Sequence, residues 1–164
     1  MPDTGSSTSR EKLSLAATIL IVDDERQAHV MLPRILANVG TQESVVHAYD
    51  GEQAIRYLES QLASGVGFPF LVFLDLEMPQ RHGLDVLRWM RERQEYPFSI
   101  VLVVSGTRSE SDRATALQLG AYAVMDKFPR PEELLGAYVS ARERLLKSHA
   151  TPRSRMRSRQ LSPA

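Results

Sequence analysis

Short runs of apolar residues alternate along the chain with segments in which apolar residues recur every three or four positions. The runs are rich in β-branched residues, which is typical of strands buried on both faces of a parallel sheet. We expect strands at residues 18–22, 45–49, 70–74, 100–104 and 121–125. Each is followed by polar or glycine-containing positions, so the pattern predicts five separate strands.

The segments between the runs carry the 3.6-residue repeat of amphipathic helices. We expect helices at about residues 30–39, 50–63, 84–93, 109–119 and 131–147. The first pattern stops at Gly40 and contains Pro33, so we expect this helix to be kinked or to begin late. Asp50 is the expected N-cap of the second helix.

Five strands alternating with five helices predict an α/β fold, a parallel sheet with helices on both faces. Right-handed crossovers then leave few topologies. A chain of 164 residues suits one such domain. We assign residues 17–147 to the domain, residues 1–16 to a flexible Ser/Thr/Gly-rich leader and residues 148–164 to a basic, disordered tail.

Composition and charge narrow the function classes. The chain has no cysteine, which excludes disulfides and thiolate metal sites. Residues 141–164 carry seven basic residues and one acid, a net +6, so residues 1–140 of this neutral chain carry −6. The basic tail lacks interleaved aromatic residues, and we expect a solvated tail rather than a nucleic-acid partner. No apolar run approaches the roughly 20 residues of a membrane span, and we expect a cytoplasmic protein without a signal peptide.

Residues with reactive side chains follow four of the five expected strands. In an open α/β sheet, ligands bind beyond the carboxyl ends of the strands. Those ends carry Asp23 and Asp24, Asp75, Ser105 and Lys127. Carboxylates packed together raise one another's pKa unless a cation intervenes, and a ligand set made only of oxygens suits Mg²⁺. A carboxylate beside a metal ion, an ammonium group and a hydroxyl can take part in phosphoryl transfer, with Asp75 as the nucleophile.

Five sequence runs carry a resemblance to a known family: LIVDDE at 20–25, FLDLEMP at 73–79, GLDVL at 83–87, VSG at 104–106 and DK at 126–127. In this order they resemble the receiver domain of two-component response regulators, over residues 17–147. The resemblance implies a flavodoxin-like (βα)5 doubly wound parallel sheet with strand order 2-1-3-4-5.

The same resemblance implies roles for individual residues. Asp24, Asp75 and the backbone carbonyl of Glu77 would hold Mg²⁺, and Asp23 would act through a bound water. Asp75 would be phosphorylated by a histidine kinase or phosphotransfer protein, with Ser105 and Lys127 contacting the phosphoryl group. The domain would catalyse only this transfer and its own dephosphorylation, as a signalling switch and not as an enzyme acting on other substrates.

Two positions depart from the family pattern. Receivers usually place an aromatic switch residue three positions before the lysine, where this chain has Val124. We interpret Val124 as a core strand residue and expect the switch to run through the loop of Ser105, Gly106 and Thr107. The family commonly has proline directly after the lysine, where this chain has Phe128. Either the Lys127–Phe128 bond is cis at about 2.5–4 kcal/mol, or the loop takes another path.

Three further side chains, Glu77, Thr107 and Trp89, have two open interpretations each. Glu77 and Thr107 either flank a hydrolytic water or are exposed loop residues. Trp89 either marks a contact patch or, as we favour, fills a gap in the core. Tyr138 and Val139 would contribute to a homodimer through the face of the fourth and fifth strands and helices.

About 17 residues follow the last expected helix, so we expect a stand-alone receiver that signals through protein–protein contacts. The long loop before the third strand and the run that follows Asp75 look similar to small receivers partnered with bacterial phytochrome-type kinases. Two alternatives stay open. A Mg²⁺-dependent phosphohydrolase of the haloacid-dehalogenase kind would carry a second Asp where this chain has Glu77, and a receiver-like binding module would not be phosphorylated.

Overall fold

The computed structural model describes residues 18–41, 43–96 and 99–149. Its single sheet has five parallel strands in the order β2-β1-β3-β4-β5, which confirms the predicted flavodoxin-like topology. The strands are β1 (Thr18–Val22), β2 (Ser44–Ala48), β3 (Leu71–Leu74), β4 (Ile100–Ser105) and β5 (Ala123–Asp126). The helices are α2 (Arg26–Ala37), α3 (Gly51–Ala63), α4 (Gly83–Arg91), α5 (Glu110–Gln118) and α6 (Pro131–His149). The predicted leader and nearly all of the predicted tail lie outside the described residues.

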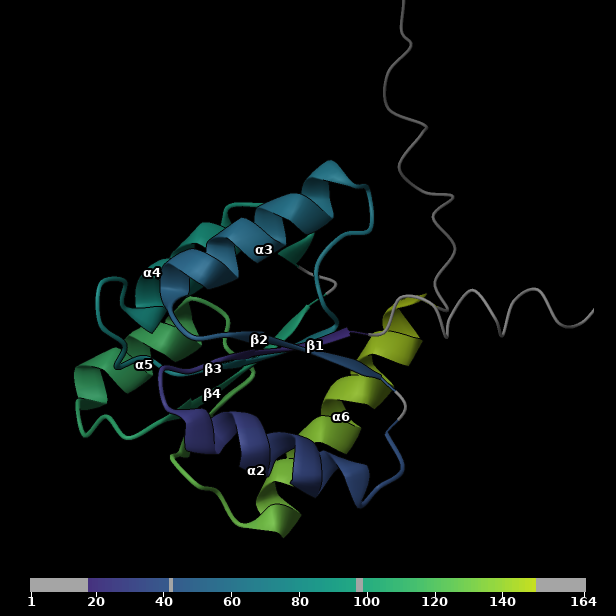
Figure 1. Ribbon diagram of the computed structural model, residues 1–164, viewed down its shortest axis with the longest axis vertical. Helices are drawn as coiled ribbons and strands as arrows, with labels where there is room; N and C mark the ends of the chain where they lie inside the picture. The colour runs from purple at the N-terminus through teal and green to yellow at the C-terminus, as the bar shows by residue number, and fades with distance from the viewer. Residues whose placement is uncertain (1–17, 42, 97–98, 150–164) are drawn as a thin grey trace, which may run out of the picture.

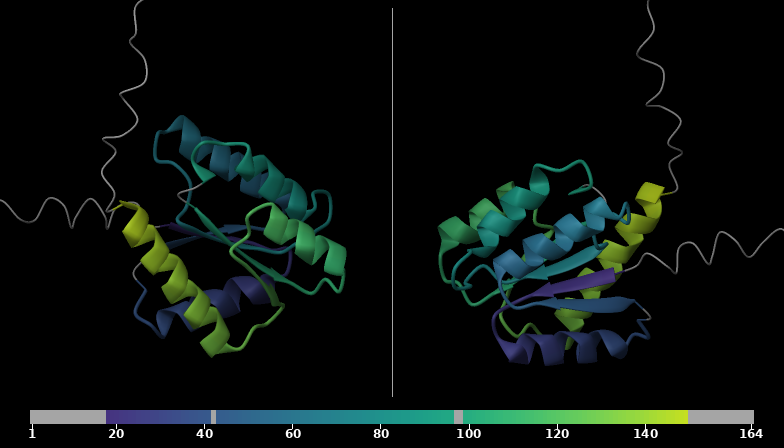
Figure 2. Two further views of the ribbon diagram at one scale, coloured as in Figure 1. Left: turned by 180° about the vertical axis from the view of Figure 1, so that it is seen from behind. Right: turned by 45° about the horizontal axis from the view of Figure 1, so that its top comes forward.

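Helices cover both faces of the sheet. Helices α3, α4 and α5 lie on one face and α2 and α6 on the other (Figures 1 and 2). Alternate residues of each strand therefore enter two separate apolar clusters. On β1, for example, Leu20 and Val22 point into the first cluster and Ile19 and Ile21 into the second. Burial on both faces explains why the central strands are continuously apolar in sequence.

The strand register brings the polar residues after the strands to one edge. Val22, the last residue of β1, pairs with Leu74, the last residue of β3. Leu74 in turn pairs with Val103 of β4, and Ser105 pairs with Asp126 of β5. The residues that follow these positions consequently emerge side by side at the carboxyl edge of the sheet.

The expectation that the first helix begins late is wrong. Helix α2 begins at Arg26 and continues to Ala37 with Pro33 inside it. A proline in a helix interior costs about 3 kcal/mol. Leu32 and Leu36 of this helix are almost fully buried, and each contributes about 1.5–3 kcal/mol by leaving water. Packing against the sheet thus outweighs the cost of the proline. Within the described segments, no helix is both long enough and apolar enough to span a membrane.

Candidate functional site

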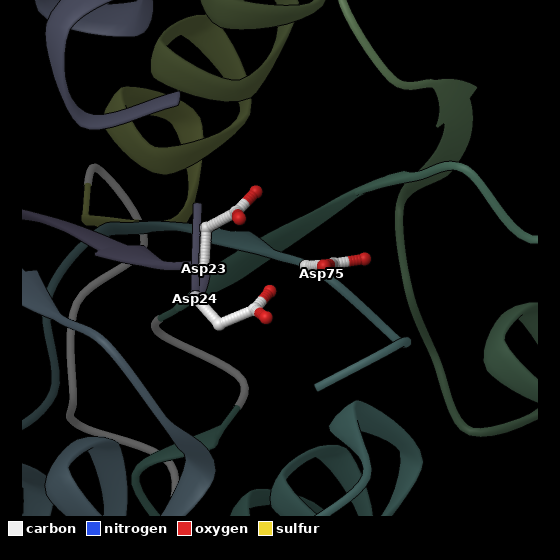
Figure 3. A group of neighbouring side chains, drawn as sticks. All are labelled: Asp23, Asp24 and Asp75. Carbon is white, nitrogen blue, oxygen red and sulfur yellow. The ribbon is translucent and has the colours of Figure 1, made fainter. Parts of the chain in front are cut away.

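Three carboxylates gather at the carboxyl ends of β1 and β3. Asp23 and Asp24 directly follow β1, and Asp75 directly follows β3. One carboxylate oxygen from each lies within 4.8 Å of the others, and Figure 3 shows the three side chains projecting into the same space. Asp23 and Asp75 are buried, whereas Asp24 is exposed. The structure therefore brings together the three acids that the strand ends suggested.

Lys127, directly after β5, ties this cluster together. Its Nζ lies 3.1 Å from Asp23 Oδ1, 3.0 Å from Asp75 Oδ2 and 3.2 Å from Glu25 Oε1. The ammonium donates hydrogen bonds to Asp23 and Asp75 and forms an ion pair with Glu25. One positive charge is thus shared among three acids. No lysine or arginine within the described part of the chain pairs with Asp24, so the site keeps an excess of negative charge.

Asp75 is held through both of its carboxylate oxygens. The Ser105 hydroxyl donates a hydrogen bond to Oδ1 at 2.8 Å, and the backbone N–H of Glu77 donates to the same oxygen at 3.1 Å. Lys127 donates to Oδ2. Ser105 Oγ also accepts weak bonds from the backbone N–H groups of Leu76 and Thr107, at 3.4 and 3.3 Å. The carboxylate therefore has one fixed orientation, and Ser105 connects it to the loop that follows β4.

The loop after Asp75 folds back against the start of α4. The N–H of Gly83 donates to the carbonyl of Leu76 at 2.9 Å. A Cβ atom at position 83 would overlap the carbonyl oxygen of Asp75 and would lie 2.8 Å from the Cα of Leu76. Glycine therefore allows α4 to begin in direct contact with the backbone of Asp75.

Burial and charge perturb two groups of the site. Burial raises the pKa of Asp23; hydrogen bonds from the Glu25 N–H and from Lys127 oppose this effect, and the nearby charge of Asp75 adds to it. Burial alone would lower the pKa of Lys127, but its hydrogen bond and charge interaction with Asp75, followed by those with Asp23, raise it above the ordinary value. The ammonium is therefore firmly protonated, while the acids around it compete for one cation.

The loop after Lys127 takes a path without a cis bond. No peptide bond among the described residues is cis, so that alternative is wrong. Phe128 instead adopts a φ of 59°, in the left-handed region that bulky residues rarely occupy. The N–H of Lys127 donates to the carbonyl of Ser105 at 3.1 Å, which holds the beginning of this loop against the end of β4.

The expected switch residues differ in their burial. Val124 is half-buried and packs against the apolar cluster under α3, α4 and α5, which favours its interpretation as a core residue. Thr107 is buried, so it is not an exposed loop residue, whereas Glu77 is exposed. The route of the switch through Ser105, Gly106 and Thr107 stays a prediction.

The structure also tests the interpretations of Trp89 and Tyr138. Trp89 is half-buried against Phe68 and the core, and the Arg93 guanidinium covers its ring at 3.4 Å from the centroid. This packing favours the gap-filling interpretation. Tyr138 is 2% exposed and donates a hydrogen bond to Glu43, so its expected place on a dimer face is wrong. The neighbouring Val139 is exposed.

Sequence reasoning missed two histidines behind the acidic cluster. His29 on α2 contacts both the backbone carbonyl of Asp23 and His47 on β2. Neither histidine belongs to a recognisable motif. Their contact depends on how α2 lies over β2, and no local sequence pattern predicts that placement.

The fold, with an acidic cluster and a lysine at the carboxyl edge of its sheet, defines a response-regulator receiver. The sequence model of the response regulator receiver domain family matches residues 19–139, and the chain belongs to this family. It is 34% identical over 113 residues to the transcriptional regulatory protein CpxR of Escherichia coli K12. That match covers 69% of this chain and 42% of CpxR, so the chain resembles less than half of that relative's length.

Solved structures agree on the fold. The receiver domain protein (CheY-like) of Methanospirillum hungatei JF-1 superposes with a TM-score of 0.67 at 23% identity, covering 80% of this chain and 98% of the other. The phosphorylated cyanobacterial phytochrome response regulator RcpA superposes with a TM-score of 0.64 at 26% identity, covering 82% and 96%. Both proteins align along nearly their whole length.

Proposed function

We propose that the chain is a phosphorylation-operated signalling switch of a two-component phosphorelay. Asp75 accepts a phosphoryl group from a histidine kinase or phosphotransfer protein, and the altered surface then binds a partner protein. One observation carries the proposal: a buried, oriented carboxylate contacts a hydroxyl and an ammonium and adjoins two further acids. The family relationship and the phosphorylated RcpA support it.

The donor set fits Mg²⁺. All three clustered groups offer carboxylate oxygens, the ligands that this ion prefers, and Asp24 among them is exposed and unpaired within the described residues. Among the residues that the structure describes, only Lys127 offsets the cluster's charge. We assign Asp24, Asp75 and the Glu77 carbonyl as ligands and Asp23 as a ligand through water. When bound, the ion neutralises charge on the phosphoryl oxygens.

The protein's own groups supply the remainder of the transfer. An oxygen of Asp75 forms a bond to phosphorus while the bond from phosphorus to the donor's imidazole nitrogen breaks, and the imidazole leaves with the electron pair of that bond. Asp75 is almost completely covered by its neighbours, so Lys127 must withdraw from Oδ2 to admit the donor. Lys127 and the Ser105 hydroxyl then contact the oxygens of the new phosphoryl group.

The change in the hydrogen bonds of Ser105 would carry the signal from Asp75 to the beginning of α5. Ser105 Oγ contacts the N–H of Thr107, and Thr107 Oγ1 accepts from the N–H of Ser109, the N-cap of α5. A Ser105 hydroxyl that turns toward a phosphoryl group would shift this chain of contacts and the beginning of α5. The output surface we propose lies on α5, β5 and α6. It includes Tyr122, directly before β5, and Val139 on α6, both of which are exposed, and it would serve a partner protein or a second copy of the chain.

Mass spectrometry after incubation with acetyl phosphate and MgCl₂ tests the proposal. We expect one added phosphoryl group on the wild type, none on Asp75→Asn and one on the control variant Asp126→Asn, whose carboxylate is 88% exposed and pairs only with Arg113 among the described residues. A wild type that stays unmodified with acetyl phosphate and with a panel of histidine kinases would refute the proposal. Sustained turnover of a phosphomonoester would instead indicate a phosphohydrolase. Partner binding that beryllofluoride leaves unchanged would indicate a binding module without a switch.

A further inference from the structure

A pair of histidines lies directly behind the acidic cluster. His29 is 7% exposed, and its Nε2 lies 2.7 Å from the backbone carbonyl oxygen of Asp23. Its other ring nitrogen, Nδ1, lies 2.8 Å from Nδ1 of His47. The Tyr49 ring packs against the His29 ring at a centroid distance of 4.2 Å. The imidazole of His29 is thus fixed on three sides.

The contacts determine where the protons lie. A carbonyl oxygen only accepts hydrogen bonds, so His29 Nε2 must carry a proton and donate it. In a neutral imidazole one nitrogen donates and the other accepts, so Nδ1 of His29 accepts from Nδ1 of His47. The pair therefore forms a directed chain from His47 through His29 to the carbonyl of Asp23, and His47 selects the tautomer of His29.

The carbonyl at the end of this chain belongs to the peptide that joins Asp23 to Asp24. The N–H of Asp23 donates to the carbonyl of Ala48 on β2 at 3.1 Å. The main chain of Asp23 is consequently held at its N–H by β2 and at its carbonyl by His29. Fixing this peptide plane fixes the direction in which Asp24 leaves the end of β1.

We infer that His29 is a positioning residue for the acidic cluster, held in its donating tautomer by His47. It touches no reacting atom, and its contribution is to hold the Asp23–Asp24 peptide so that both carboxylates face Asp75. The inference rests on the proposed function, since it assigns His29 a role in the affinity for Mg²⁺. Partners that orient metal ligands typically change metal affinity 10–100-fold when they are removed.

Two substitutions separate hydrogen bonding from packing. His29→Gln keeps an N–H donor at a reach similar to that of imidazole Nε2, whereas His29→Leu keeps an apolar side chain of comparable bulk and removes the donor. Calorimetric titration with MgCl₂, without any phosphoryl donor, measures the affinity of each protein. We expect His29→Leu to bind Mg²⁺ about 10-fold more weakly and His29→Gln to recover most of that loss. Equal affinity of wild type and His29→Leu, or an equal loss in both variants, would overturn the inference.

A measurement on the metal-free wild type tests the same geometry without any variant. Imidazole nitrogen NMR distinguishes protonated from bare ring nitrogens, and we expect His29 to be protonated at Nε2 and His47 at Nδ1. A bare Nε2 on His29 would refute the inference even if His29→Leu failed to fold. A wild type that takes up no Mg²⁺ would refute the proposed metal site, and this inference with it. A wild type that binds Mg²⁺ as tightly as His29→Leu refutes this inference alone.

Discussion

The requirement for glycine at position 83 is directly testable. In Gly83→Ala the new Cβ would overlap the Asp75 carbonyl oxygen and crowd the Leu76 Cα. Both obstacles are backbone atoms next to the proposed phosphorylation site, so no side-chain rotation relieves them and α4 must move away. Overpacking of this kind typically costs about 1–3 kcal/mol, and we expect a loss of stability in that range, together with slower phosphorylation of Asp75.

Gly136→Ala is the matched control. Gly136 lies inside α6, and beyond its chain neighbours and the backbone of its own helix a Cβ there would meet no atom within 4 Å. Alanine is favoured over glycine in a helix interior by about 0.5–1 kcal/mol, so the same chemical change should stabilise the protein at this position. Urea denaturation followed by circular dichroism measures both values. A Gly83→Ala variant within about 0.5 kcal/mol of the wild type, phosphorylated at the wild-type rate, would refute the argument.

Three further outcomes follow from the described contacts. Tyr138→Phe should lose about 1–3 kcal/mol in urea denaturation because it removes a donor from the buried Glu43 carboxylate, whose Oε2 has no partner among the described residues. Burial, assisted by Glu43, raises the pKa of Tyr138 to about 12. The contribution of the Tyr138 hydroxyl to stability is therefore complete below pH 10 and is lost as the pH rises through about 12. If the stability of the wild type and of Tyr138→Phe depended on alkaline pH in the same way, this reasoning would be contradicted. Lys127→Met should cost about 3–5 kcal/mol at pH 7 because two buried carboxylates lose their cation. The loss should shrink in acid as Asp23, whose pKa burial raises, becomes protonated; an unchanged loss at low pH would exclude this cause. Mg²⁺ at about 100 times its Kd for the wild type should stabilise the wild type by about 2.7 kcal/mol, and the same concentration should stabilise Asp24→Asn far less. Thermal unfolding with and without chelator measures both effects. The affinity of the wild type for Mg²⁺ should fall as the pH falls through the raised pKa of Asp23.

The sequence was sufficient to predict the sheet and the residues that follow its strands. This succeeded because buried parallel strands are continuously apolar, and because parallel strands end at a common edge. Hence the sequence alone predicts that the acids after β1 and β3 and the lysine after β5 meet. Element boundaries were less certain. Strand β5, for example, begins at Ala123 and not at the predicted position 121.

Features that depend on how elements pack could not be predicted in this way. Pro33 argued against a helix beginning at Arg26, and only the burial of the helix face against the sheet reverses that expectation. Tyr138 looked available for a partner because the pattern did not show that Phe70 and Glu43 would enclose it. The contact between His29 and His47 joins residues 18 positions apart on different elements. In each case the deciding interaction is tertiary.

The charge distribution around Lys127 links these observations to signalling. In the described state one ammonium holds Asp23, Glu25 and Asp75 together, so the loops after β1, β3 and β5 share a single electrostatic contact. A phosphoryl group on Asp75 would add negative charge and new acceptor oxygens at one of these three partners, and the ammonium would be drawn toward it. The loops after β1 and β5 would then lose part of their common contact while Ser105 turns away from Thr107. With Val124 packed against the core in place of an aromatic switch, this redistribution of hydrogen bonds at the carboxyl edge is the mechanism that we propose for the switch.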